Sequence, residues 1–130
     1  MHRILLRTVV LDLGPEVHDT ALEFWKTALD AGARPAKEYP EYHVMRHPAA
    51  VGSVVVQRLG EGASRIHLDI ESDDVPAEVE RLAAAGASVV QTVNDWTVMR
   101  DPAGLLFCVV PADSVSGTGD FDEHARTVGD

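Results

Sequence analysis

The 130-residue sequence has one cysteine, few aromatic residues and no apolar run long enough to cross a membrane. The single cysteine, Cys108, excludes an internal disulfide and is typical of a reducing compartment, so we expect a cytoplasmic protein. Asp12 interrupts the apolar residues at the start of the chain, and no small-residue cleavage site follows them. This start therefore predicts a first strand and not a signal peptide.

Basic residues are also scarce, since 11 Lys and Arg stand against 21 Asp and Glu, giving a net charge of −10. Nucleic acids and anionic membranes both require a basic surface, so we expect neither as a partner. No Gly-x-Ser-x-Gly elbow occurs, and the glycine-rich residues 60–64 are not followed by the lysine and helix start of a phosphate loop. The hydrophobic content of 45% is that of one ordinary globular domain.

The most informative pattern present is an internal repeat. Residues 31–50 recur in outline at residues 85–104, with AGA and VMR-x-PA on matching positions. A solenoid needs about three or more copies, so two copies predict a pseudo-symmetric pair of modules. The seam between two such modules is a natural place for a ligand pocket.

Hydrophobic periodicity predicts an α+β protein in which each module has the order βαβββ. The first module is expected to contain a strand near 4–13, a helix from 17–20 to about 29, and strands near 34–39, 42–46 and 53–59. In the second we expect a strand at 65–71, a helix capped by Asp73 or Asp74 and ended by Gly86, and strands near 88–93, 95–100 and 105–110. Residues 101–104 (DPAG) are typical of a type I turn.

The C-terminal segment from residue 112 is small, polar and acidic, and we expect it to be frayed. The alternative is one short docked helix that uses Phe121, Ala125 and Val128.

Three segments, EFWKTALDAGA at 23–33, HLD at 67–69 and DPAG at 101–104, resemble the vicinal oxygen chelate superfamily. This superfamily contains glyoxalase I, bleomycin-resistance proteins and extradiol dioxygenases. The resemblance implies one glyoxalase-like domain over residues 1–111, with modules at about 4–59 and 65–111 forming a half-barrel sheet around a cavity, and a tail at 112–130. It also implies a homodimer, and leaves open whether the modules pair within one chain or between chains.

In this superfamily metal ligands project into the cavity from the first and fourth strand of each module, which here implies Val10, Gln57, His67 and Cys108. Of these residues only His67 is a usual ligand of a hard divalent metal, since valine cannot ligate and a thiolate favours a softer ion. We therefore expect no metal cofactor. A divalent metal held by His67 with Gln57 or Cys108 is the alternative.

Strand alternation predicts which side chains share the cavity face. If Ile66, Leu68 and Ile70 pack under the second helix, Arg65, His67 and Asp69 face the cavity, and the same rule places Asp12 and Cys108 there. The predicted ligand-binding residues are Asp12, Gln57, His67, Asp69, Trp96 and Cys108. His67 is the candidate catalytic residue, because an imidazole exchanges protons near neutral pH.

Each of these residues also has a structural interpretation. His67 can be held by Asp69 or a backbone group, Asp69 can pair with Arg65, Asp12 can cap the first helix, and Cys108 can be a small buried hydrophobe. We expect Trp25 in the core. The remaining histidines are expected on the solvated surface, namely His2, His18, His43, His47 and His124.

Three functional hypotheses follow. The first is a protein that binds a small organic molecule in the cavity without a glyoxalase-type metal site. The second is a metal-free or single-metal isomerase, lyase or oxygenase that uses His67. The third is a non-catalytic dimerisation domain.

Overall fold

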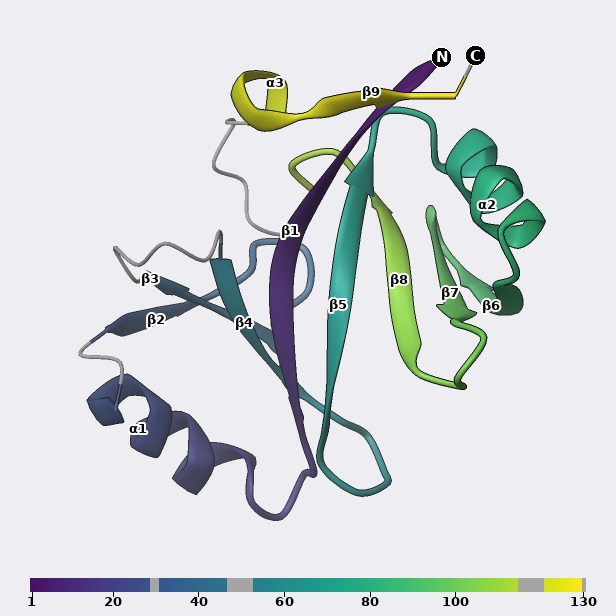
Figure 1. The fold of residues 1–130 in the computed structure, drawn as a ribbon. Coiled ribbons are helices and arrows are strands. Elements are labelled where there is room, and N and C mark those ends of the chain that lie inside the picture. Colours follow the sequence, from purple (N-terminus) through teal and green to yellow (C-terminus); the bar gives the residue numbers. More distant parts are fainter. Residues whose placement is uncertain (29–30, 47–52, 115–120, 130) are drawn as a thin grey trace. The chain divides into compact units, whose positions relative to one another are not determined.

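The computed structural model describes residues 1–28, 31–46, 53–114 and 121–129 (Figure 1). These residues form two compact units, one of residues 8–67 and the other of residues 1–7 with 68–130. No helix among the described residues combines the length and the apolar character needed to span a membrane. The predicted fold class is confirmed, since the chain is α+β and repeats the order βαβββ.

The unit of residues 8–67 contains the first module. Its β1 pairs in parallel with β4, and β3 pairs antiparallel with both β4 and β2. The helix and strand positions agree with the predictions to within a few residues, except that β2 is shorter and begins earlier. The elements are β1 (His2–Leu13, from Thr8 onward), α1 (His18–Ala28), β2 (Gly32–Pro35), β3 (Tyr42–Arg46) and β4 (Ser53–Arg58).

One face of this sheet is covered by α1. Its core consists of Leu11, Leu13, Ala31, Met45 and Val56, with Ala21, Leu22 and Trp25 of the helix packed against it. Trp25 therefore has the predicted core role, whereas the neighbouring Phe24 is 61% exposed. Because successive strand residues point to opposite faces, the odd-numbered residues of β1 fill this core and Val10 and Asp12 belong to the other face.

The other unit contains the second module, in which β5 pairs in parallel with β8 and β7 pairs antiparallel with β8 and β6. The elements are β5 (Arg65–Ser72, from Leu68 onward), α2 (Val75–Ala84), β6 (Ser88–Val93), β7 (Trp96–Arg100), β8 (Leu106–Pro111), α3 (Phe121–His124) and β9 (Arg126–Val128).

The ends of α2 follow their predicted signals. Asp74 is the N-cap, and its carboxylate accepts a hydrogen bond of 3.0 Å from the Ala77 amide. Gly86 follows the last turn with a φ of 116°, a backbone conformation that favours glycine. The turn at residues 101–104 is closed by a 3.0 Å hydrogen bond from the Gly104 amide to the Asp101 carbonyl. Local sequence therefore determines where this helix and this hairpin end.

The most buried side chain of α2 is a carboxylate and not an apolar group. Val75, Val79 and Leu82 are only half-buried, and the helix residue with 0% exposure is Glu78. Leu68 is 41% exposed, so the premise that it packs under the second helix is wrong.

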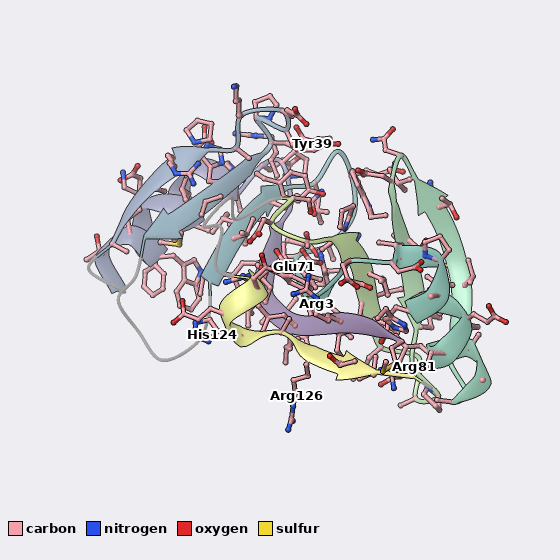
Figure 2. All side chains as sticks on the ribbon, turned by 90° about the horizontal axis from the view of Figure 1, so that it is seen from above. Arg3, Tyr39, Glu71, Arg81, His124 and Arg126 are labelled. Atoms are coloured by element: carbon pink, nitrogen blue, oxygen red, sulfur yellow. The ribbon has the colours of Figure 1, made fainter. Side chains whose placement is uncertain are left out.

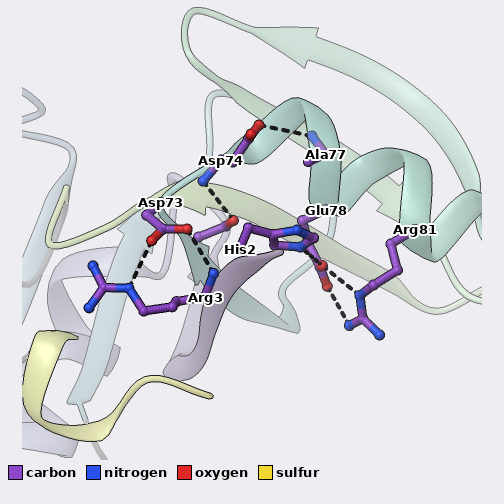
Figure 3. A network of polar contacts seen from close by, with 8 residues as sticks. His2, Arg3, Asp73, Asp74, Ala77, Glu78 and Arg81 are labelled. Atoms are coloured by element: carbon purple, nitrogen blue, oxygen red, sulfur yellow. Dashed lines mark hydrogen bonds and ion pairs between the residues drawn. The ribbon is translucent and has the colours of Figure 1, made fainter. Parts of the chain in front are cut away.

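The Glu78 carboxylate can be buried because Arg81 and His2 form hydrogen bonds to it (Figure 3). The His2 Nε2 atom lies 2.6 Å from Oε2, and Arg81 donates to both oxygens at 2.8 Å. Burial alone would raise the pKa of the Glu78 carboxyl, but the hydrogen bonds from Arg81 and His2 outweigh it and lower the pKa. His2 is 9% exposed, so its predicted place on the solvated surface is wrong.

The C-terminal segment is more ordered than expected. Phe121 of α3 is 2% exposed, and β9 pairs antiparallel with residues His2–Ile4 of β1. The Arg3 guanidinium lies 5.3 Å from the centre of the Phe121 ring and donates to Asp73 and Asp122. The prediction of a frayed tail is wrong for residues 121–128, and the docked-helix alternative is closer. Figure 2 shows the Arg126 side chain extending away from β9.

We expect Glu78→Gln to lower the free energy of unfolding by about 1–3 kcal/mol, because the amide cannot accept at both positions from His2 and Arg81. Urea denaturation measures the change. Glu80→Gln, on the exposed side of the same helix, is the control and should change stability by less than about 0.5 kcal/mol. Equal effects of the two variants would contradict a structural role for the buried carboxylate.

We expect Phe121→Ala to release the C-terminal segment, because this ring is the buried anchor of α3. Hydrogen exchange by mass spectrometry should show faster exchange of the amides in Arg126–Val128, with the helices α1 and α2 unchanged. Phe24→Ala, which truncates an exposed ring, should leave this exchange slow. Fast exchange of β9 already in the unchanged protein would show that the tail does not dock.

Candidate functional site

An aspartate and a histidine form the centre of the candidate site in the unit of residues 8–67. The His67 Nδ1 atom lies 2.5 Å from Oδ2 of Asp12, which places a β1 carboxylate beside the start of β5. The Asp12 side chain is 2% exposed and that of His67 is 12% exposed. The Arg65 Nε atom lies 4.0 Å from the same oxygen. Asp12 is therefore a buried carboxylate with an imidazole partner and a nearby cation.

The direction of the hydrogen bond follows from its chemistry. An ionised carboxylate only accepts, so Nδ1 of His67 donates and a neutral ring keeps its lone pair on Nε2. This arrangement orients the ring, and an imidazole can exchange protons near neutral pH. Sequence reasoning favoured Asp69 or a backbone group as the partner of His67, because cross-strand partners are not visible in the sequence.

Gln57 shares the sheet face with Asp12. The two residues are register partners in the parallel pairing of β1 with β4, and Tyr42 is opposite Gln57 on β3. The next row of the same face holds Val10 and Val55, both 0% exposed, and Val44. A few polar groups beside apolar side chains are typical of a surface that binds small molecules.

Arg34 and Tyr42 were missed as candidates for this face. Arg34 is opposite Val44 in the β2–β3 pairing, which gives it the same facing as Val55 and Val10. Arg34 lies within the predicted strand at 34–39, but alternation alone does not say which face it occupies, because that depends on the pairing of β2 with β3. The only sequence signal for Tyr42 is that it is aromatic, like Trp96 at the equivalent position of the repeat.

The other unit holds the remaining predicted residues on one face of its own sheet. Asp69 is the register partner of Cys108, which is opposite Val98, and Trp96 alternates with Val98 on β7. Asp69 and Cys108 are 4% and 8% exposed, and Trp96 is half-buried. A carboxylate oxygen of Asp69 and the Cys108 sulfur lie within 4.8 Å of one another. Cys108 thus has the buried position expected of a small hydrophobe.

These donors do not fit the metal group that the superfamily resemblance implies. Val10, the counterpart of His67 in the first module, is fully buried and has no donor atom. Gln57 offers only a neutral amide, and the thiolate of Cys108 prefers a softer metal than the carboxylate of Asp69 does.

A family model for the glyoxalase-like domain matches residues 8–110. The chain belongs to this family. The resemblance to the vicinal oxygen chelate superfamily is thereby confirmed. No curated protein matches the chain in sequence.

Solved structures show the same fold at low sequence identity. Methylmalonyl-CoA epimerase from Mycobacterium tuberculosis is 16% identical with a TM-score of 0.59, over 82% of this chain and 87% of that chain. A mutant of 4-hydroxymandelate synthase from Streptomyces coelicolor is 15% identical with a TM-score of 0.56, over 82% of this chain and 48% of that chain. A putative dioxygenase from Bacillus subtilis is 12% identical with a TM-score of 0.54, over 81% and 40%. These likenesses show the fold and no particular activity.

The other histidines include two further departures from the predictions. His18 is 1% exposed, so its predicted place on the solvated surface is wrong, and His43 is half-buried. His124 is exposed as expected, and His47 lies outside the described residues. His18 and His43 belong to the helix-covered side of the first sheet, away from Asp12.

We expect Asp12→Asn to change the tautomer of the His67 ring, because an amide can present its own N–H to Nδ1. Long-range ¹H–¹⁵N NMR on labelled protein, above the titration of the ring, distinguishes the Nδ1–H form from the Nε2–H form. The unchanged protein should hold the Nδ1–H form, and the variant should lose that preference. Glu61→Gln, in an exposed loop, is the control. An Nε2–H ring in the unchanged protein would contradict the deduced hydrogen bond.

Proposed function

We propose that this glyoxalase-like protein binds a small organic molecule on the sheet face that carries Asp12, Gln57 and His67, without a glyoxalase-type metal. The 2.5 Å contact between Asp12 and His67 is the observation that carries the proposal. Burying a carboxylate has a large desolvation cost, and His67 offsets that cost at only one of the two oxygens of Asp12.

One oxygen of the Asp12 carboxylate can still accept a hydrogen bond from a ligand. Oδ2 accepts from His67, while Oδ1 is buried and makes no hydrogen bond to any described residue. A ligand with an N–H or O–H group would satisfy this oxygen, and the Val10, Val44 and Val55 row provides an apolar surface for its body. Planar cationic and aromatic compounds with a donor group are therefore the first class to test.

We also propose that the other unit contributes ligand-binding residues, namely Asp69, Trp96 and Cys108. A homodimer is part of the same proposal, since the superfamily resemblance implies one. A measurement of the protein's mass in solution would show whether the stoichiometry of ligand binding should be expressed per chain or per dimer.

Catalysis is the second candidate function, and the orientation of the His67 ring favours it. With its Nδ1–H held by Asp12, the ring is oriented for proton exchange with a bound substrate, as in isomerisation or elimination. This would be an acid–base reaction carried by His67 alone, with Asp12 as the residue that positions it. The third hypothesis, a non-catalytic dimerisation domain, requires neither ligand nor proton transfer.

We expect at least one class of planar cationic or aromatic compound to raise the melting temperature of the full-length protein. Binding at a concentration of 100 times Kd stabilises by about 2.7 kcal/mol, which a thermal-shift assay detects readily. The shift should be lost in Gln57→Ala and His67→Ala, because each removes a polar group from the proposed face. His124→Ala, which truncates an exposed histidine of α3, should keep it.

Absence of a shift across all compound classes would contradict binding and favour the dimerisation domain. A shift that survives in His67→Ala and Gln57→Ala would move the ligand away from this face. For a compound that the protein also converts, full activity of His67→Ala would remove the catalytic candidate, and activity that tracks added metal would contradict the metal-free form.

A further inference from the structure

Two histidine rings lie side by side on the helix-covered side of the first sheet. The ring centres of His18, at the start of α1, and His43, on β3, are 5.2 Å apart and their planes are tilted by 49°. His43 is the register partner of Val56, which belongs to the core under α1. The pair is therefore on the opposite face from Asp12 and is not part of the site described above.

The hydrogen bond of His18 fixes which of its nitrogens is a donor. Nδ1 lies 2.8 Å from Oδ1 of Asp19, so it carries the proton shared with this carboxylate, and a neutral ring has its lone pair on Nε2. Asp19 also accepts from the Arg58 guanidinium, which holds the carboxylate in place. The Nε2 atom is buried and has no hydrogen-bond partner within residues 1–28, 31–46, 53–114 and 121–129.

His43 presents a second nitrogen of the same kind. Its Nδ1 atom is buried and likewise has no hydrogen-bond partner among the residues that the structure describes. A metal ion binds the neutral form of an imidazole through such a nitrogen.

Two neighbouring buried nitrogens without partners need a common explanation. Leaving one such group unsatisfied costs about 1–3 kcal/mol, and a bound water or ion would remove that cost. A metal-binding histidine almost always donates its other ring N–H to a carboxylate, which is the arrangement of His18 with Asp19. Imidazole nitrogens suit Zn²⁺, Ni²⁺ and Cu²⁺ rather than Mg²⁺ or Ca²⁺.

We propose that His18 Nε2 and His43 Nδ1 together bind one divalent transition-metal ion of the Zn²⁺ class, with water completing its coordination. The ion would join α1 to β3. The positive charge of Arg58 opposes binding, and the Asp19 carboxylate between it and His18 offsets that charge. The site is independent of the ligand face, and its test does not depend on any activity.

The test is a Zn²⁺ titration of full-length, untagged protein that has been treated with a chelator, in competition with a chromogenic chelator. We expect one Zn²⁺ per chain. His18→Gln and His43→Gln should each weaken binding by more than about tenfold, and Asp19→Asn by about 10- to 100-fold, as for other outer carboxylates of metal-bound histidines. His67→Gln and His124→Gln are the matched controls and should bind as the unchanged protein does.

A second measurement covers the case in which His18→Gln fails to fold, which circular dichroism reveals. Zn²⁺ added to ¹⁵N-histidine-labelled, unchanged protein should shift Nε2 of His18 and Nδ1 of His43 and leave the His67 ring unaffected. Absence of Zn²⁺ binding would show that water alone fills the position and would overturn the proposal. Loss of binding in His67→Gln with retention in His43→Gln would place the metal on the other face and would overturn it as well.

Discussion

The parallel pairing of the first and fourth strands within each module is the constraint on which the rest of the structure depends. In the first module it puts Asp12 opposite Gln57, and in the second it puts Asp69 opposite Cys108. A slip of one residue would exchange the two faces of a strand, moving the Asp12 carboxylate into the core under α1 and Leu11 out of it. Burial of Leu11, Leu13 and Val56 against the helix therefore fixes the position of the polar face as well.

The two modules share this strand pairing but differ in the side chains at equivalent positions. Asp12 and Asp69 occupy equivalent places, and so do Gln57 and Cys108 opposite them. His67, however, is matched by Val10, which is fully buried among apolar residues. The backbone repeats because hydrogen-bond register and helix packing need only the right pattern of side chains. The donor atoms need not repeat, and a metal centre built from both modules loses its ligands when one copy carries valine.

The sequence predicts what depends on near neighbours in the chain. Strand alternation predicts the facing of Asp12, the family resemblance implies Gln57 beside it, and Gly86 and Asp74 mark the ends of α2 because capping is a local event. The predicted face could not include Arg34, since its facing depends on the pairing of β2 with β3, which the sequence does not reveal.

The interactions that the sequence did not reveal are the polar ones between distant residues. His2 and Glu78 are 76 positions apart, and Arg3 and Asp122 are 119 apart. No periodicity links such residues, and a polar histidine or glutamate taken alone favours the surface. His2 was misplaced for this reason, as was the tail, whose order depends on a ring packed beside Arg3. His18 was misplaced because its ring lies beside that of His43 on another element.

The buried carboxylates themselves separate scaffold from site. Glu78 is saturated, since His2 and Arg81 use both of its oxygens, and Glu71 pairs with the buried guanidinium of Arg7. Burial raises the pKa of Glu71 and Arg7 opposes that rise, which is the balance expected of a structural ion pair. Asp12 differs, because one of its oxygens makes no hydrogen bond to any described residue while the other orients an imidazole. A carboxylate with a purely structural role would be more stable with a hydrogen-bond partner at both of its oxygens. The incomplete satisfaction of Asp12 therefore distinguishes it from Glu78, whose two carboxylate oxygens both have hydrogen-bond partners.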